Sequence, residues 1–162
     1  DALPADELAH RLSAFGAVYA GWAYSDEFFL SGAYRQFGYE SPETVLDGWA
    51  RDHVAMNAAD LAAQLDAWLH ANVPERATAD AGANADNPPL VAMPSRTDRY
   101  FLTETLEDAR DDFPGMEIVE IDSDLGHIAG RPGIREAETE HIKAQVDKLF
   151  SRIAPRHPEG IP

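Results

Sequence analysis

The first part of the chain places its apolar residues with the period of an α-helix. Between residues 5 and about 24, large apolar side chains recur at three- and four-residue steps: Leu8, Leu12, Phe15, Val18, Tyr19 and Trp22. Such spacing brings these side chains onto one face of a helix, and a folded protein buries such a face. The pattern therefore predicts one long helix with a single buried face.

Three more helices are predicted in the same part of the chain. A shorter pattern from residue 26 to residue 37 ends near Gly38, a residue type common just beyond a helix. Ser41, followed by proline, combines a capping hydroxyl with a favoured first-turn residue and begins a third helix. Asn57 caps a fourth helix in the same way. We therefore expect residues 1–73 to form an all-helical unit.

The pattern changes after this unit. Residues 74–89 contain few large apolar side chains and many turn formers, which predicts a linker. Residues 90–93 are a short apolar run bounded by prolines, typical of a buried parallel strand, and residues 117–121 predict a second strand. Helices are predicted from Thr103 to about residue 113 and from Glu136 to about residue 153.

The order strand, helix, strand, helix in residues 90–154 predicts an α/β arrangement. It implies two parallel strands joined by a right-handed crossover, with residues 155–162 left as a tail. A parallel sheet of only two strands is not stable in water. Further strands from elsewhere are therefore expected beside it.

Charge and composition narrow the classes of partner. The 162 residues are 44% hydrophobic, enough for one ordinary domain, and carry 13 basic against 29 acidic side chains, a formal charge of -16. This charge repels phosphate backbones and anionic membranes, so neither nucleic acid nor a membrane is an expected partner. The chain contains no cysteine, and it contains no apolar stretch long enough for a membrane span. We expect a soluble, cytoplasmic protein.

Two polar loops follow the two predicted strands. Residues 95–101 follow the first and contain Asp98, and residues 122–127 follow the second and end at His127. Because the carboxyl ends of parallel strands lie at one edge of a sheet, these two side chains are expected to meet there. An aspartate that accepts a hydrogen bond from one imidazole nitrogen leaves the other nitrogen free to act as a general base.

The nucleophile for such a base is not evident in this sequence. No serine lies in a G-x-S-x-G elbow, and no cysteine is present. The other histidines lack the spacing of metal ligands, so no metal site is predicted, and no glycine-rich phosphate loop opens a helix. His127 is therefore expected to serve a nucleophile carried elsewhere.

Three motifs in chain order resemble one family of enzymes. The segments AFGAVYAGWAYSDEFF, LVAMPSRTDRYF and GHIAG, within about residues 10 to 150, are similar to the C-terminal half of α/β-hydrolases of the homoserine O-acetyltransferase-like family. The resemblance implies an α/β fold in which residues 1–73 form a helical lid and residues 90–154 supply the last two strands of the core. It also implies a Ser-Asp-His triad in which Asp98 and His127 are the acid and the base.

The same resemblance implies a partner and a reaction. The nucleophilic serine would lie on a separate N-terminal chain of the same hydrolase, which would complete the fold as a two-chain enzyme with a possible homo-oligomeric state. The substrate would be a small-molecule ester or acyl compound, and ester hydrolysis would need no cofactor. Tyr100, Phe101 and, from the lid, Trp22 are candidates for binding it, with core packing as the alternative role.

One departure from the family pattern bears on the acyl acceptor. Homoserine acyltransferases of this family carry an aspartate directly after the histidine, whereas this chain carries Ile128. A sec-butyl group cannot pair with the amino group of homoserine. Ester hydrolysis is therefore favoured over O-acyl transfer from acetyl-CoA, which remains the alternative enzyme reaction.

A second alternative belongs to another functional class. Most of the aromatic side chains of the protein lie within residues 1–73. Such a concentration is also typical of a non-catalytic helical domain that binds a protein partner through an aromatic surface. That alternative predicts a chain that folds alone and whose function does not depend on Asp98 or His127.

Overall fold

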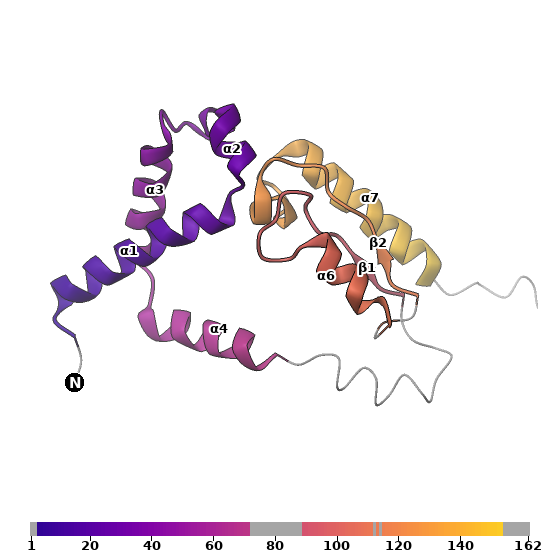
Figure 1. The fold of residues 1–162 in the computed structure, drawn as a ribbon, viewed down its shortest axis with the longest axis horizontal. Coiled ribbons are helices and arrows are strands. Elements are labelled where there is room, and N and C mark those ends of the chain that lie inside the picture. Colours follow the sequence, from indigo (N-terminus) through magenta and orange to yellow (C-terminus); the bar gives the residue numbers. More distant parts are fainter. Residues whose placement is uncertain (1–2, 72–88, 112, 114, 154–162) are drawn as a thin grey trace, which may run out of the picture.

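The computed structural model describes residues 3–71, 89–111, 113 and 115–153 (Figure 1). Apart from residue 89, the predicted linker of residues 74–89 lies outside the described residues, and so does the predicted tail of residues 155–162. No helix in the described ranges is long and apolar enough to cross a membrane.

The described residues up to residue 71 are helical, as the sequence pattern predicts. They form α1 (Ala5–Ala23), α2 (Asp26–Ser31), the 3-10 helix η1 (Ala33–Phe37), α3 (Pro42–Val54) and α4 (Ala58–His70). The predicted caps are confirmed: the Ser41 side chain accepts from the Thr44 N–H in a capping box, and the Asn57 side chain accepts from the Ala59 N–H.

The second predicted helix is interrupted. Residues 26–37 were expected to form one helix, but Gly32 has φ of 75°, which ends α2 and begins η1. Glycine adopts this left-handed conformation without the steric cost of a Cβ atom. The prediction of its end is confirmed, because Gly38 caps η1 with φ of 80°.

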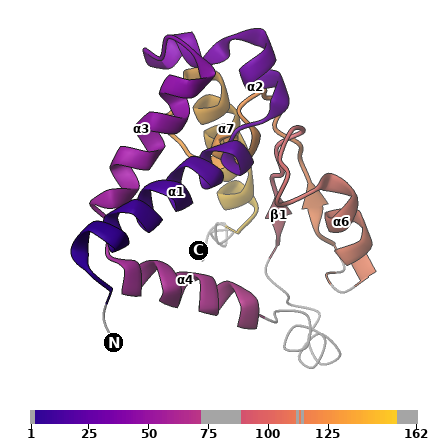
Figure 2. The same cartoon turned by 60° about the vertical axis from the view of Figure 1, so that its left-hand side comes forward.

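The buried face of α1 differs from the predicted one. Val18 and Trp22 were expected to be buried, but they are 64% and 50% exposed. The residues of α1 that are buried are mostly small: Leu12, Gly16, Ala20 and Ala23. Figures 1 and 2 both show α1 lying against α3, and small side chains allow this close approach of two helices. The large apolar residues are displaced to the margins of the contact.

Gly16 gives a direct test of this close packing. A Cβ atom at Gly16 would lie 2.5 Å from the carbonyl oxygen of Trp49 and 2.8 Å from Cγ of His53. We expect Gly16→Ala to destabilise the protein by about 1–3 kcal/mol, because α1 and α3 must move apart. Gly21→Ala, in the same helix, meets nothing within 4 Å and should stabilise by about 0.5–1 kcal/mol. Equal unfolding midpoints for the two variants in urea would contradict the proposed close packing.

The sheet is parallel and has two strands in the described residues. Strand β1 (Val91–Ala92) pairs with β2 (Glu117–Ile118), and an isolated parallel bridge joins Ser95 to Ile121. Backbone hydrogen bonds continue between these points, from the Val119 N–H to Ala92 and from the Ile121 N–H to Pro94. The pairing therefore extends along the full predicted strands, and both strands end at the same edge of the sheet.

The helices around the sheet follow the prediction with one correction. Helix α7 (Glu136–Ile153) is confirmed at its predicted position. Thr103 was expected to cap a helix reaching residue 113, but Leu102 occupies the cap position of α6 (Thr103–Asp108), which passes into the 3-10 helix η2 (Ala109–Asp111). The hydroxyl of Thr103 instead donates to Glu120 Oε2 at 3.0 Å.

One hydrophobic core joins the two parts of the chain. Its buried residues come from α1 to α3 and from the segment around residues 121–129: Tyr24, Phe28, Ala33, Tyr34, Val45, Ile121, Leu125 and Ala129. Figure 1 shows the corner between α1 and α2 beside this second segment, whereas α4 extends away and contains no buried residue. The helical part and the α/β part are thus packed together beside the strand ends.

Candidate active site

The two polar loops lie side by side at the carboxyl end of the sheet. We name residues 95–101 the acid loop and residues 122–127 the histidine loop. The Ser95 to Ile121 bridge and the hydrogen bond from the Arg96 N–H to the Ile121 carbonyl hold their starting points together. The histidine loop then enters the 3-10 helix η3 (Gly126–Gly130).

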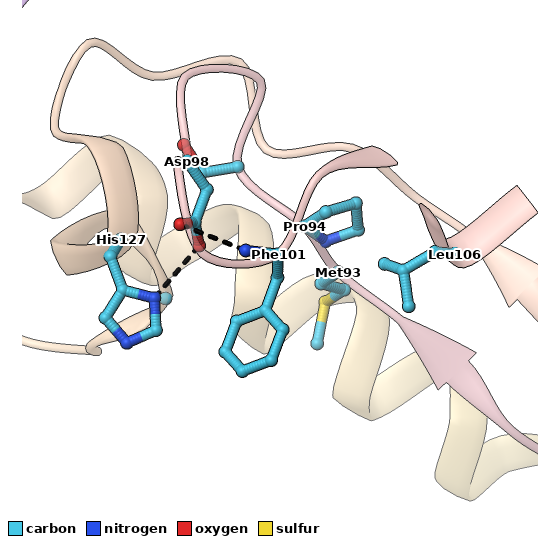
Figure 3. Close-up of a pocket in the computed structure, with 8 residues that line it drawn as sticks. Met93, Pro94, Asp98, Phe101, Leu106 and His127 are labelled. Atoms are coloured by element: carbon cyan, nitrogen blue, oxygen red, sulfur yellow. Dashed lines mark hydrogen bonds and ion pairs between the residues drawn. The ribbon is translucent and has the colours of Figure 1, made fainter. Parts of the chain in front are cut away.

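Asp98 and His127 are in direct contact. His127 Nδ1 lies 2.9 Å from Asp98 Oδ2, and Figure 3 shows the imidazole turned toward the carboxylate. The other carboxylate oxygen accepts the backbone N–H groups of Tyr100 at 2.7 Å and Phe101 at 3.3 Å. Asp98 is 8% exposed, whereas the His127 side chain is 31% exposed. The carboxylate is therefore fixed on both oxygens, and the imidazole remains accessible.

This geometry sets the protonation pattern of the pair. A carboxylate accepts a hydrogen bond, so Nδ1 carries the proton and Nε2 presents its lone pair. A buried carboxylate in this position also stabilises the imidazolium that forms when Nε2 takes a proton. The pair can therefore act as a general base and then as a general acid toward a group placed at Nε2.

Two arginines of the acid loop bind the start of α2. Arg96 donates to both carboxylate oxygens of Glu27 at 2.8 Å and, through Nε, to Asp122 at 2.9 Å. These hydrogen bonds raise the pKa of Arg96, and the same contact with Arg96 lowers the pKa of Glu27. Arg99 pairs with Asp26 and donates to the Gly21 carbonyl at 3.1 Å. Exposed ion pairs of this kind add little to the free energy of unfolding. Their geometry, however, holds the acid loop against the start of α2.

The histidine loop rests on the corner between α1 and α2. Gly126 has φ of 66°, and a Cβ atom there would lie 2.7 Å from the Ser25 backbone nitrogen. Ser25 caps α2 by accepting from the Phe28 N–H at 3.0 Å, and its hydroxyl donates to the Asp124 carbonyl. Leu125 is fully buried in the shared core. The sequence identifies Ser25 as a residue beside a helix but gives no sign of this contact.

A buried polar network ties the histidine loop to α7. The Ser123 hydroxyl donates to Glu138 Oε1 at 2.5 Å, and Arg135 donates to Glu138 at 3.1 Å and to Asp124 at 2.7 Å. Glu138 is only 5% exposed. Asp122 and Asp124, in the predicted polar loop, therefore each pair with an arginine. The sequence pattern did not single out Glu138.

The three predicted substrate-binding residues have different surroundings. The Phe101 ring lies 5.5 Å from the imidazole and the Tyr100 ring 4.9 Å from it, between centroids. Trp22 reaches the Tyr100 ring at 6.0 Å. A pocket of about 210 Å³ beside the pair is lined by Met93, Pro94, Ser95, Asp98, Phe101, Leu106, His127 and Gly130. Phe101 thus contributes to this pocket, whereas Tyr100 lies against the imidazole outside the pocket lining, and Trp22 lies against Tyr100.

Partial desolvation of Tyr100, which is 39% exposed, predicts a loss of stability at alkaline pH. Desolvation first, and then the nearby Tyr19 and Asp98, raise the pKa of Tyr100 to about 12 from 10.0. Above pH 10.0 the unfolded chain releases this proton before the folded protein does, so stability is lost as the pH rises toward about 12. We expect the unfolding free energy of Tyr100→Phe, measured in urea titrations, to fall less steeply with pH over this range than that of the wild type. An equal decrease of the unfolding free energy with pH in the variant and the wild type would contradict the raised pKa of Tyr100.

The described residues do not show a nucleophile or a metal centre. No described serine forms a hydrogen bond with His127. Ser95 lines the pocket, but its Oγ is buried and has no hydrogen-bond partner among the described residues. No group of three or more metal-ligating side chains occurs in the described ranges. The acid and base pair therefore lacks a third member among the residues that the structure describes.

Comparisons with known proteins identify the fold. Neither protein-family models nor curated protein sequences give a match. Among solved structures, an acetylester hydrolase from Corynebacterium glutamicum matches with a TM-score of 0.79 and 25% identity over 91% of this chain. The acetyl esterase MekB matches with a TM-score of 0.80 and 20% identity over 91% of this chain. The 162 residues span only 43% of each esterase chain.

The fold is therefore that of the C-terminal part of an α/β-hydrolase, as expected from the sequence. The two structural neighbours are acetyl esterases rather than homoserine acyltransferases.

Proposed function

We propose that these residues belong to a serine-dependent ester hydrolase in which Asp98 is the orienting acid and His127 the general base. The observation that carries the proposal is the 2.9 Å contact between His127 Nδ1 and Asp98 Oδ2 at the end of parallel strands. The similarity to an acetylester hydrolase over 91% of the chain supports the same reaction class.

The proposed reaction proceeds through an acyl-enzyme. His127 Nε2 takes the proton of a serine hydroxyl as its oxygen attacks the ester carbonyl. The imidazolium, held by Asp98, then gives this proton to the leaving alcohol as the ester bond breaks. In the second half, Nε2 takes a proton from water, the hydroxide attacks the acyl-serine, and the proton returns to the serine oxygen. The products are a carboxylic acid and an alcohol.

We propose that the serine is supplied by polypeptide outside these 162 residues. The chain spans 43% of the esterases that it matches, which leaves more than half of their length without a counterpart. The sheet supports this as well: Leu90, Ala92 and Pro94 accept backbone hydrogen bonds from residues 117–121. Val91 and Met93 therefore direct their backbone groups to the opposite edge. No described strand pairs with that edge, which suits further strands of a larger sheet.

The pocket supports a small ester with an apolar group. Its volume of about 210 Å³ and its lining by Met93, Phe101 and Leu106 favour a short hydrocarbon portion over a charged one. Acetyl esters of small alcohols are the first substrates to examine, since both structural neighbours are acetyl esterases.

Ile128 favours hydrolysis over acyl transfer. The alternative reaction is O-acyl transfer from acetyl-CoA, as in the homoserine O-acetyltransferase-like family. Ile128, directly after the base, packs against the hydrophobic core and offers no charge to an amino-alcohol acceptor. Water is therefore the proposed acyl acceptor.

The test is a fluorophosphonate label combined with an ester assay on the complete enzyme. We expect hydrolysis of 4-nitrophenyl acetate, no stimulation by homoserine, and a label on one serine located by mass spectrometry outside these residues. Hydrolysis without labelling would contradict the serine mechanism. Absence of both activities in folded protein would instead favour the non-catalytic binding domain.

A further inference from the structure

We propose that Thr97 is a positioning residue whose hydroxyl sets the distance between Asp98 and His127. The proposal rests on the proposed function for its kinetic consequence, but its geometry does not. Thr97 directly precedes the acid in the chain, and its hydroxyl contacts the histidine loop rather than its own loop.

The Thr97 hydroxyl links the two loops through both of its hydrogen-bonding roles. It donates to the Ser123 carbonyl at 2.8 Å and accepts the Gly126 N–H at 3.0 Å. Gly126 directly precedes His127. The residue before the acid is therefore joined to the residue before the base, and the two backbone contacts span the turn of residues 123–126 that leads directly to His127.

Other contacts hold the loops at different points. Arg96 joins the acid loop to Asp122 and to the Ile121 carbonyl, but both contacts lie where the loops begin. The Ser25 hydroxyl and the Leu125 side chain hold the histidine loop against the α1–α2 corner. Arg96 and Arg99 hold the acid loop to the same corner, so these contacts place the two loops relative to each other only through the helices.

The Thr97 hydroxyl is therefore the link nearest to the catalytic pair in the part of the chain that the structure describes. The Asp98 to His127 hydrogen bond lies closer still, but it is the contact whose geometry the Thr97 hydroxyl is proposed to set. Without the hydroxyl, the Gly126 N–H and the Ser123 carbonyl lose a shared partner, and the ends of the two loops can separate.

The expected effect is on turnover rather than on substrate binding. A displacement of a catalytic base by about 1 Å costs up to about 100-fold in rate. We expect Thr97→Val, which keeps the shape but removes the hydroxyl, to lower kcat about 10- to 100-fold with little change in KM. Thr97→Ser keeps the hydroxyl and should restore kcat to near the wild-type value.

Thr139 supplies a matched control. Its hydroxyl also bridges two backbone groups, accepting the Gly133 N–H at 2.8 Å and donating to the Arg135 carbonyl at 2.7 Å. Thr139→Val removes the same kind of bridge at the start of α7, away from the acid and the base, and should leave kcat unchanged. If Thr97→Val does not fold, Thr97→Ala, which removes the methyl group as well, takes its place.

A second readout does not depend on turnover. In complete protein with ¹⁵N-labelled histidine rings, the Nδ1 proton of His127 should give a downfield resonance that is assigned by its loss in His127→Ala. This resonance should weaken or broaden in Thr97→Val and persist in Thr97→Ser and Thr139→Val. Loss of the resonance without any His127-dependent hydrolysis would retain the positioning role and reject the proposed function.

Two results would overturn the positioning role. An unchanged resonance and unchanged kcat in Thr97→Val would show that the shared core and the contacts of Arg96 are enough to hold the loops. An equal loss of kcat in Thr97→Val and Thr97→Ser would assign the effect to packing rather than to the hydroxyl.

Discussion

For the proposed hydrolase, Asp98→Asn in the complete protein is expected to lower kcat for acetyl ester hydrolysis about 10⁴-fold while leaving the fold intact. The carbonyl oxygen of the introduced amide can still accept from the Tyr100 and Phe101 N–H groups, which Asp98 Oδ1 holds at 2.7 and 3.3 Å in the wild type. The NH₂ group of the amide, however, faces His127 Nδ1 and donates to it. The imidazole must then carry its proton on Nε2, where it cannot accept one from serine.

The chain contains a matched control for this substitution. Asp66 and His70 on α4 also form a carboxylate and imidazole pair, with 3.4 Å between Oδ1 and Nδ1, but both side chains are 74% exposed. Asp66→Asn should change neither kcat nor the melting temperature appreciably. Initial rates at saturating substrate give the comparison. A loss of less than about tenfold in Asp98→Asn would mean that Asp98 is not the orienting acid.

The meeting of Asp98 and His127 could be predicted because it depends on topology. Two short apolar runs separated by a helix imply parallel strands, and parallel strands end at one edge. The backbone hydrogen bonds between residues 90–96 and residues 117–121 bear this out. Asp98 and His127 each follow the end of a strand by only a few residues. The positions that the carboxylate and the imidazole could occupy were therefore already restricted.

The contacts of these loops with the helical part could not be predicted from the pattern. Arg96 and Glu27 are 69 positions apart in sequence, and many acidic residues could have paired with that arginine. The exposure of Val18 and Trp22 was missed for a related reason. Periodicity shows that a helix has an apolar side, but the small residues around Gly16 decide where a second helix can approach.

The helical part is consequently a structural support of the site and not only a cover for it. Tyr24 and Phe28 share one core with Leu125, and Ser25 binds the backbone of the histidine loop. Movement of the α1–α2 corner relative to the sheet would therefore carry the histidine loop with it. A change of substrate access would have to come from segments outside this corner, such as α4, which buries no residue of its own.

His127→Ala is expected to have the largest effect, lowering kcat about 10⁴- to 10⁶-fold, because it removes the group that takes and returns the proton. The fluorophosphonate label should also react far more slowly, since the same base activates the serine. Members of a triad act as a unit, so adding Asp98→Asn should cost no more than about a further twofold. His70→Ala, the exposed imidazole of the control pair, should remain fully active. Multiplicative losses in the double variant would show that Asp98 and His127 act separately, and would contradict the pairing at 2.9 Å as the basis of catalysis.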